Sequence, residues 1–474
     1  MGHAYEKVVA DLYARWNRQL GTDVFFLTGT DENGQKLVKA AEAEKIPTKE
    51  YVDAQVKAFE KLCIDLKISK NDFIRTTEAR HHKTCQEFWT KLEAKGDIYF
   101  GAYEGQYCLA CESFYTELQA PDGLCPVHGT KLDAVKEKGY FFRLSSYADW
   151  VRSFISDNPN FISPASARKE MLNRIDKEPI RDLSVSRPNA GWGIPIPGHE
   201  DFVMYTWFDA LINYLSAVAT PDLFKKYWPA DMHVIGKDIT WFHAVIWPAM
   251  LKAADYELPK QIYVHGMVLG EDGKKMSKSL GNGVDPQTII SKFPIDSFRY
   301  YLLRAIPSGL DGAFVTADLR MRHNSELAND YGNLLMRVVK LGMKKCGSDF
   351  SPEGVTGHFN FETLGAKMAE SMNEREHHRA LELLWASINE VNLYLNDKAP
   401  WKLEGADPKF KETIYNALYA IHSFGTLISP FMPEVGEKTL FSLGTENKGM
   451  RGLKFGIHQF KLVEPPVLFP KMDA

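Results

Sequence analysis

A lysine-rich loop offers the first candidate chemistry in the sequence. The stretch EDGKKMSKSLGN, residues 271–282, places Lys274, Lys275 and Lys278 between two glycines. Mobile lysines can close over a polyphosphate and neutralise charge that builds up on its leaving group, which helps catalysis only where the contact is stronger in the transition state. The loop lacks the GxxxxGK[ST] spacing of a Walker motif. Taken alone, it is more typical of a solvated turn.

A second phosphate-binding element is expected at the N-terminus. Gly2 and His3 directly precede a helical apolar pattern over residues 4–20. The free backbone N–H groups and the positive dipole end of a helix favour an anion at such a position. A lone histidine at a helix start is more often a cap than a catalytic group. A catalytic role for His3 is therefore indicated only by its combination with the lysine loop.

Aromatic residues gather on two predicted helices. Trp207 and Tyr214 lie on the first, and Trp241, His243 and Trp247 lie on the second. Aromatic residues at helical spacing are equally typical of a core. If both helices flank a cleft, the rings form a pocket for an apolar side chain, and a thioether packs well against ring edges. Asp31, in the turn TGTDENG, would then pair with an ammonium group.

Three cysteines and a histidine form the strongest local motif. Cys108, Cys111, Cys125 and His128 have the spacing C-x2-C-x13-C-x2-H. Two tight pairs joined by a hairpin-length segment suit a tetrahedral Zn²⁺, and four protein ligands leave no open position for water, so we expect a structural metal. The alternative is three unligated thiols beside a surface histidine.

Strands and helices must alternate to position these residues. An apolar run over residues 24–28 is typical of a parallel strand covered on both faces. Later segments predict helix, strand, helix and strand in turn: TWFDALINYLSAVAT, MHVIG, DITWFHAVIWPAMLKA and KQIYVHG. This order predicts a doubly wound α/β sheet whose ligands lie beyond the carboxyl ends of the strands. The lysine loop follows the strand that ends at His265, at that edge.

The rest of the chain divides by composition. Residues 96–203 are rich in Gly, Pro, Tyr and short strand-like runs, and we interpret them as an insertion into an α/β domain formed by 1–95 and 204–264. Residues 265–322 carry the lysine loop, and 323–474 have the apolar spacing of a helical bundle.

Composition narrows the class of protein. A chain of 474 residues with 45% hydrophobic and 25% charged residues is typical of a soluble protein with more than one domain. It has no apolar run of 18 residues and no secretory leader pattern, so we expect no membrane span and a cytoplasmic location. A net charge of -4 does not by itself indicate nucleic-acid binding, although local basic surfaces are compatible with it.

In this order, the N-terminal Gly2 and His3, TGTDENG, the cysteine motif, TWFDALINY, IGKDITWFHAVIWPAM and KKMSKS resemble the methionyl-tRNA synthetase family of class I aminoacyl-tRNA synthetases. The resemblance covers essentially the whole chain. It implies that methionine attacks the α-phosphate of ATP, in the presence of Mg²⁺, and that the methionyl group then passes from the adenylate to tRNA(Met). A Rossmann-like catalytic domain, a zinc-knuckle insertion and an all-α anticodon-binding bundle are the implied domains.

The resemblance also implies roles for individual residues. The catalytic group would comprise His3, Lys275 and Lys278. The ATP site would comprise Gly2, His3, Gly236, Asp238, His265, Gly266, Met267, Val268, Lys275 and Lys278. The methionine site would comprise Asp31, Trp207, Ala210, Tyr214, Ile239 and His243. The anticodon readers would be Asn333, Arg337 and Trp401, whose aromatic and hydrogen-bonding groups suit an unstacked base.

The sequence departs from the family pattern at two places, and both affect the catalytic activity that we expect. The family's first strand and the first half of its HIGH motif should precede Gly2, so we expect a truncated chain with impaired catalysis. Asn33 stands where the family turn TDEHG has histidine, and asparagine cannot take a proton. We expect a modest effect of this substitution.

Other readings remain open on the sequence alone. Other class I synthetases are the nearest alternatives. The enzymes for valine, isoleucine and leucine carry a much larger editing insertion than the one here, which argues against them. Cysteinyl enzymes place zinc in the amino-acid pocket itself, whereas the predicted zinc site here has no open position. A catalytically impaired fragment that acts as a tRNA-binding module is the alternative from another class. The helical domain with Trp401 disfavours a nucleotidyltransferase without an RNA partner. We expect a monomer.

Overall fold

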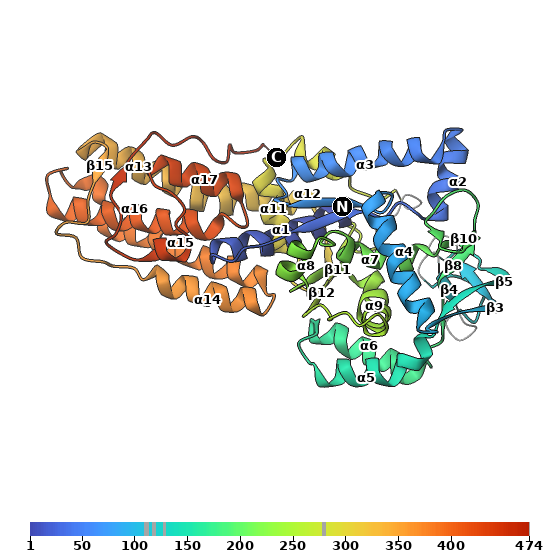
Figure 1. The fold of residues 1–474 in the computed structure, drawn as a ribbon. Coiled ribbons are helices and arrows are strands. Elements are labelled where there is room, and N and C mark those ends of the chain that lie inside the picture. Colours follow the sequence, from blue (N-terminus) through green and yellow to red (C-terminus); the bar gives the residue numbers. More distant parts are fainter. Residues whose placement is uncertain (109–112, 116–119, 127–128, 277–280, 474) are drawn as a thin grey trace. The chain divides into compact units, whose positions relative to one another are not determined.

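The computed structural model describes residues 1–474 except 109–112, 116–119, 127–128, 277–280 and 474 (Figure 1). The chain forms two compact units. Unit 1 consists of residues 1–24, 62–69 and 265–474. Unit 2 consists of residues 25–61 and 70–264.

Two parallel strands near the N-terminus begin unit 2. β1 (Leu27–Thr30) pairs with β2 (Asp72–Arg75), and the register aligns Thr30 with Arg75. β1 starts later than the predicted run 24–28 because its partner strand starts at Asp72, the register partner of Leu27. Just before β1, the Phe26 carbonyl accepts from the backbone N–H groups of Asn71 and Asp72.

The other predicted strands are present in a second sheet of unit 2. β11 (His233–Gly236) corresponds to MHVIG, and β12 (Ile262–His265) corresponds to KQIYVHG. The sheet order is β11-β12-β6, in which β6 (Ile162–Ser163) runs parallel to β12. β6 comes from the region interpreted as an insertion, so that region also completes this sheet.

The helices of unit 2 pack around these strands. The helices are α2 (Gln35–Glu44), α3 (Thr48–Asp65, which continues into unit 1), α4 (Ala79–Ala94), η1 (Leu144–Tyr147), α5 (Ala148–Asp157), α6 (Ala165–Lys177), α7 (Thr206–Ser216), α8 (Pro221–Tyr227), η2 (Lys237–Ile239), η3 (Phe242–Ile246) and α9 (Trp247–Ala253). The helix predicted for DITWFHAVIWPAMLKA is thus divided, and η3 is a π-helical turn. Pro248 lacks the N–H that a regular helix needs at this point, which accounts for the wider turn before it.

The insertion contains two small antiparallel sheets. β3 (Ile98–Cys108) and β5 (Asp133–Phe142) form its long ladder, flanked by β4 (Ser113–Tyr115) and β7 (Leu183–Ser184) in the order β4-β3-β5-β7. β8 (Ser186–Pro188), β10 (His199–Met204) and β9 (Pro195–Ile196) form the other sheet. The strand-like composition of this region predicted these elements.

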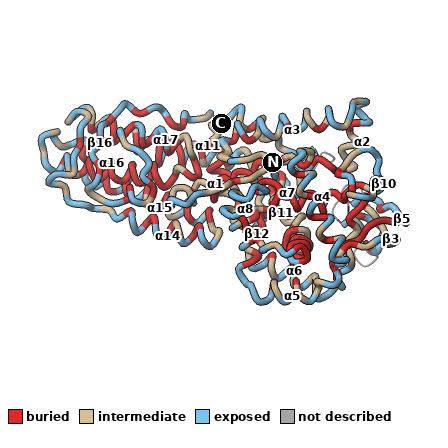
Figure 2. Tube along the Cα trace, viewed as in Figure 1, coloured by how far each residue is buried: buried red, intermediate tan, exposed pale blue. Residues whose placement is uncertain are grey.

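Unit 1 is mainly helical, as predicted for residues after 323. The helices are α1 (Gly2–Gln19), α10 (Pro286–Ile290), α11 (Ile295–Ala305), α12 (Thr316–Arg322), the π-helical η4 (His323–Gly332), α13 (Asn333–Cys346), α14 (Phe361–Asn373), α15 (His377–Lys398), η5 (Pro400–Lys402), α16 (Pro408–Ile428), α17 (Pro433–Ser442) and η6 (Gly449–Leu453). Its short strand pairs are β13 (Val268–Leu269) with β14 (Gly312–Ala313), and β15 (Asp349–Phe350) with β16 (Phe460–Lys461). Every residue of α16 from 413 to 428 is buried, so this helix forms the centre of the bundle (Figure 2).

A buried ion pair secures α1 within unit 1. The Arg299 guanidinium lies 2.7 Å from the Asp11 carboxylate, and both side chains are fully buried. Arg299 also donates to the carbonyls of Leu66 and Phe431, so its charge is compensated. Burial alone would raise the pKa of Asp11, but Arg299 and Arg15 hold it below its ordinary value.

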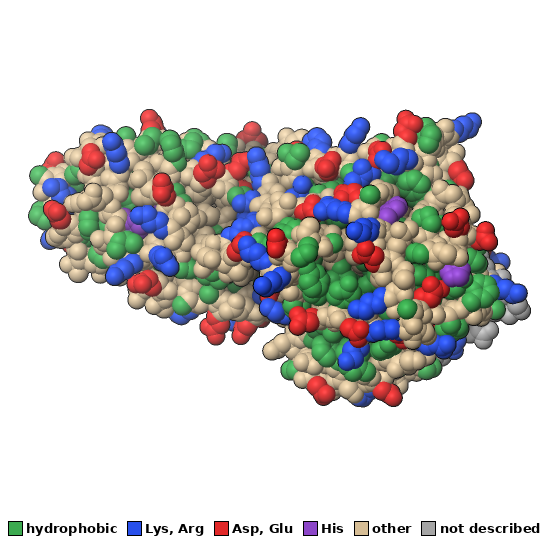
Figure 3. Space-filling model, in the orientation of Figure 1, with side chains coloured by type: hydrophobic (Ala, Val, Ile, Leu, Met, Phe, Trp, Pro, Cys, Tyr) green, Lys and Arg blue, Asp and Glu red, His purple; other side chains and the backbone are tan. Residues whose placement is uncertain are grey.

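Charged side chains of both signs are interspersed over the visible surface (Figure 3), in agreement with the small net charge. Among the described residues, none of the helices combines the length and the apolar character that crossing a bilayer requires.

Candidate functional site

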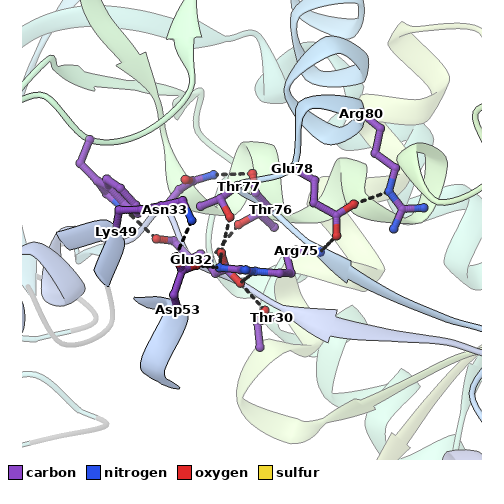
Figure 4. A network of polar contacts seen from close by, with 11 residues as sticks. Thr30, Glu32, Asn33, Lys49, Asp53, Arg75, Thr76, Thr77, Glu78 and Arg80 are labelled. Carbon is purple, nitrogen blue, oxygen red and sulfur yellow. Dashed lines mark hydrogen bonds and ion pairs between the residues drawn. The ribbon is translucent and has the colours of Figure 1, made fainter. Parts of the chain in front are cut away.

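The turn after β1 presents one carboxylate and buries another. Asp31 is exposed, whereas Glu32 and Asn33 are buried. Glu32 accepts from the Thr30 hydroxyl at 2.6 Å and from the Arg75 guanidinium at 2.8 and 3.1 Å (Figure 4). The parallel pairing of β1 and β2 brings these residues together, since both strands end at the same edge.

Asn33 connects this turn to the helix that carries the predicted aromatic pocket. Its Nδ2 donates to the Thr76 carbonyl at 3.2 Å and to the Asp209 carboxylate at 3.4 Å. Asp209 lies on α7, on the buried side of the helix, two residues after Trp207. Its other oxygen lies 3.7 Å from Nε2 of His81 on α4. The sequence did not indicate these contacts, which join three segments far apart in the chain.

The half-buried Tyr214 and the buried His243 form a hydrogen-bonded pair. The Tyr214 hydroxyl lies 2.7 Å from His243 Nε2, and His243 Nδ1 lies 3.0 Å from the Ile239 carbonyl. A carbonyl can only accept, so Nδ1 carries the proton and the tyrosine hydroxyl donates to Nε2. Burial lowers the pKa of His243 to about 4, and the pair is therefore uncharged at neutral pH.

The remaining aromatic contacts lie next to this pair. Trp207 stacks on Phe242, with ring centroids 4.0 Å apart and an interplanar angle of 14°. Tyr214 packs on His233 at 3.9 Å. Ala210 is buried between Trp207 and Tyr214 on α7. Tyr214, His243 and Trp247 are thus neighbours, and Trp247 is at the same time a fully buried residue of the hydrophobic core of unit 2.

Two predicted nucleotide-contacting residues follow β11. Gly236 ends this strand and precedes η2, and Asp238 lies exposed within η2. Ile239 ends η2 and supplies the carbonyl that fixes the His243 ring. Gly236, at the carboxyl end of the strand, and Asp238 therefore lie in or next to the short helix whose last residue orients His243.

In unit 1, the start of α1 lies beside the segment after β12. Gly2 and His3 are exposed in the first turn of α1, and the Tyr5 ring packs edge-on against His265 at 5.3 Å. A Cβ on Gly266 would lie 1.8 Å from the Leu310 carbonyl oxygen, so only glycine fits there. The Tyr5–His265 contact thus places the first turn of α1 beside the end of β12.

The lysine loop begins in a tight turn within unit 1. The Gly270 N–H donates to the Lys274 carbonyl at 2.9 Å, and Leu269 and Lys275 form an isolated bridge. Asp272 accepts from the Lys274 N–H at 3.0 Å. Lys274 and Lys275 are exposed. Lys278 lies outside the described residues.

Met267 and Val268 lead from β12 into the short pairing that supports this loop. The Met267 N–H donates to the Asp311 carboxylate at 2.7 Å, and its carbonyl accepts from the Gly312 N–H at 3.0 Å. Val268 is buried in β13. The backbone of this segment is therefore fixed by strand β14 and the residue before it.

Two of the four predicted metal ligands are described. Cys108 ends β3, and Cys125 lies in the loop before β5. Both thiols are buried in one small cluster that also contains Ala120 and Leu132. Cys111 and His128 lie outside the described residues. Within the ranges that the structure describes, no group of three or more potential ligands comes together.

The predicted RNA-contacting residues share one region of the bundle. The Arg337 guanidinium lies 5.8 Å from the centre of the exposed Trp401 ring. It also donates to Asn392 and Asn396 on α15 at 3.1 and 3.4 Å. Asn333 is exposed one turn earlier on α13. Arg337 and Trp401, distant in sequence, are thus brought together.

Comparisons with known proteins match both ends of the chain. The family described as tRNA synthetases class I (M) matches residues 1–134 and 122–339. The anticodon binding domain of methionyl tRNA ligase matches residues 360–472.

Curated relatives match over the full length of the chain. The methionine--tRNA ligase of Caldanaerobacter subterraneus subsp. tengcongensis is 42% identical, over 100% of this chain and 77% of the relative. That of Rickettsia felis is 41% identical, over 100% of this chain and 96% of the relative. A crystal structure of Mycobacterium tuberculosis methionyl-tRNA synthetase bound by methionyl-adenylate is 36% identical, with a TM-score of 0.93 over 99% of this chain and 96% of that one.

Proposed function

The chain belongs to the class I methionyl-tRNA synthetases, and from that premise we propose that it activates methionine with ATP and transfers the methionyl group to tRNA. The observation that carries the proposal is the full-length match to methionine--tRNA ligases at about 40% identity. A solved relative named for its bound methionyl-adenylate supports the activation step.

Unit 2 supplies the proposed methionine site. The Asp31 carboxylate pairs with the substrate ammonium, and the side chain lies among Trp207, Ala210, Tyr214, Ile239 and His243. The neutral Tyr214–His243 pair supports this assignment, because a thioether is uncharged and polarisable and packs well against aromatic rings.

The proposed ATP site draws on a different group of residues. Gly2 and His3, at the start of α1, contact the phosphates, and Gly236, Asp238 and the segment from His265 through Gly266 and Met267 to Val268 lie along the adenosine. The methionine carboxylate oxygen attacks the α-phosphate, and the bond to the bridging oxygen of pyrophosphate breaks. Lys275 and Lys278 neutralise the charge on the departing pyrophosphate. Mg²⁺ bound to ATP would screen the phosphate charge.

We also propose a structural Zn²⁺ held by Cys108, Cys111, Cys125 and His128. The two described thiols fit the group, since both are buried in one cluster. Thiolates and one imidazole are typical of structural zinc sites. The metal would stabilise the insertion, residues 96–203.

For tRNA, we propose that Asn333, Arg337 and Trp401 read the anticodon within a helical domain of residues 323–474. The catalytic domain would comprise residues 1–95 and 204–264, followed by a connecting region of residues 265–322. Because this reaction serves protein synthesis, we propose a cytoplasmic location.

A purified sample tests the function in two assays. We expect methionine-dependent exchange of pyrophosphate into ATP, and methionylation of tRNA. Binding of tRNA without exchange would instead support a non-catalytic tRNA-binding module. Leucine and isoleucine in place of methionine are the controls, and exchange with either as fast as with methionine would contradict the proposed substrate.

A further inference from the structure

Glu32 is an anchor inside the turn that presents Asp31. Its side chain is only 2% exposed, and both of its carboxylate oxygens accept hydrogen bonds. Arg75 binds it through two nitrogens, while the hydroxyls of Thr30 and Thr77 complete the set (Figure 4). A planar guanidinium that binds a carboxylate in this two-point manner fixes its orientation as well as its position.

The backbone of the turn is fixed at the same residue. The Glu32 N–H donates to the Thr76 hydroxyl at 2.8 Å, and the Glu32 carbonyl accepts from Trp192 Nε1 at 2.9 Å. Thr76 directly follows β2, whose last residue, Arg75, is the register partner of Thr30. Side chain and backbone of Glu32 therefore connect the turn to the end of the neighbouring strand.

Arg75 is held in turn by the helix α3. It donates to the Asp53 carboxylate at 2.6 Å, and Asp53 also accepts from Lys49 at 2.6 Å. Hydrogen bonds from Lys49 and Arg75 lower the pKa of Asp53, and those from Arg75 to Glu32 and Asp53 raise the pKa of Arg75. The Arg75 guanidinium thus binds both the buried carboxylate of Glu32 and the half-exposed carboxylate of Asp53. A rotation of Arg75 away from Glu32 would also break its hydrogen bond to Asp53.

Asp31 has a different environment from its neighbour. It is exposed, while the next three residues of the turn are buried. An exposed carboxylate on a mobile turn would have to be ordered when it binds a ligand, and that ordering weakens the binding. A turn that is already fixed avoids this loss.

We propose that Arg75 and Glu32 are positioning residues for methionine: they fix the turn 31–34 so that the Asp31 carboxylate is already placed for the substrate ammonium. The inference rests on the proposed role of Asp31 in methionine binding. Arg75 and Glu32 act through Asp31 and do not contact the substrate themselves.

Arg75→Met tests the proposal against a matched control. It removes the two-point contact with little change in side-chain volume. Arg80→Met is the control, because Arg80 lies on α4, after the same strand, and also pairs with two carboxylates, Asp72 and Glu78, neither of which belongs to the turn 31–34. Glu78 also accepts from the Arg75 backbone N–H, and that donor is kept in both variants. We expect Arg75→Met to raise KM for methionine about tenfold in pyrophosphate exchange, with KM for ATP within about twofold. Arg80→Met should change neither KM by more than about twofold.

A milder variant covers the case in which Arg75→Met fails to fold. Thr77→Val keeps the shape of the side chain and removes one hydrogen bond to Glu32. We expect KM for methionine to rise about threefold while the thermal midpoint stays close to that of the wild type. An unchanged KM for methionine in folded Arg75→Met would overturn the proposal. If Arg75→Met does not fold, an unchanged KM for methionine in Thr77→Val would overturn it.

Ligands with and without an amino group separate positioning from general damage to the fold. Methioninol adenylate carries the ammonium group, and its desamino counterpart does not. In Arg75→Met, inhibition by the first should weaken about tenfold and inhibition by the second should be unchanged. Equal weakening of both would show a merely structural role. If wild-type protein shows no methionine-dependent exchange at all, the proposed function fails instead, so the two failures can be told apart.

Discussion

The hydroxyl of Tyr214 donates to Nε2 of His243, and the opposite ring nitrogen donates to the Ile239 carbonyl. Both imidazole nitrogens are therefore used, and the ring is buried and neutral. A charged ring at this position would favour water over a thioether, so the neutral hydrogen-bonded pair is compatible with the methionine side chain that we propose for this site.

Tyr214→Phe should weaken methionine binding. The substitution leaves His243 Nε2 buried without its donor, which typically costs about 1–3 kcal/mol. We expect KM for methionine to rise about tenfold in pyrophosphate exchange, with KM for ATP unchanged. Tyr227→Phe, on α8 of the same unit, is the control. Equal effects of the two variants would argue against a role of Tyr214 in the methionine site.

The protein should lose stability in mild acid. Burial lowers the pKa of His81 and His243 to about 4 and of His377 and His422 to about 3, from the ordinary value of 6.5. Below about pH 6.5 the unfolded chain takes up protons at these rings and the folded chain does not, so stability falls as the pH falls toward 4. Burial raises the pKa of Asp296 to about 6 and also raises the pKa of Asp330, and these two carboxyl groups oppose the trend.

Scanning calorimetry checks the sign of this effect. We expect the thermal midpoint to decrease from pH 7 to pH 5, and unfolding near pH 5.5 to take up protons. A midpoint that is constant or increases over this interval would contradict the prediction. His422→Gln should make the dependence on pH less steep, because it removes one of the four groups.

Lys275→Ala should slow adenylate formation itself. Loss of one group that stabilises developing negative charge typically lowers kcat about 100-fold or more. KM for methionine should stay within about twofold, since Lys275 is assigned to pyrophosphate. Lys274→Ala is the adjacent control, because both lysines are exposed in the same turn. Similar losses of kcat in both variants would indicate a general charge effect.

Trp401→Ala should separate the two steps of the reaction. A base stacked on an aromatic ring typically gains about 1–3 kcal/mol, so we expect KM for tRNA in methionylation to rise about tenfold or more. Pyrophosphate exchange without tRNA should be unchanged. Equal losses in both assays would remove the anticodon assignment of Trp401 and of Arg337, which lies over its ring.

Metal analysis tests the zinc proposal. We expect about one zinc per chain in the purified protein and a lower thermal midpoint after chelation. Cys108→Ser should abolish the bound zinc, whereas Cys63→Ser, a buried thiol of unit 1, should retain it. Wild-type protein that contains no zinc when purified without chelators would contradict the proposal.

Sequence periodicity was sufficient for elements with one clear buried face. The pattern over residues 4–20 predicted α1, whose residues Val8, Leu12 and Trp16 are buried, and the apolar spacing after residue 323 predicted the bundle. The family was recognisable because its motifs occur in order. Asn33 is buried and bonded to Asp209, a contact that no local pattern shows.

Other features depend on interactions between distant segments. β6 pairs with β12 across about a hundred residues, and the two-point contact of Arg75 with Glu32 exists only because the register aligns Thr30 with Arg75. A two-residue strand such as β6 has no periodicity to detect. The π-helical turn at His243 has the same apolar spacing as an ordinary helix, so sequence periodicity did not distinguish it.

Gly266 sets a limit on redesign of the segment 265–268, which we propose to contact the nucleotide. The methyl group of an alanine at this position would overlap the Leu310 carbonyl, so the backbone at residue 266 and at Leu310 would have to move apart. A library that randomises residues 265–268 to alter nucleotide preference should therefore hold this position constant, and the useful diversity will come from the other three.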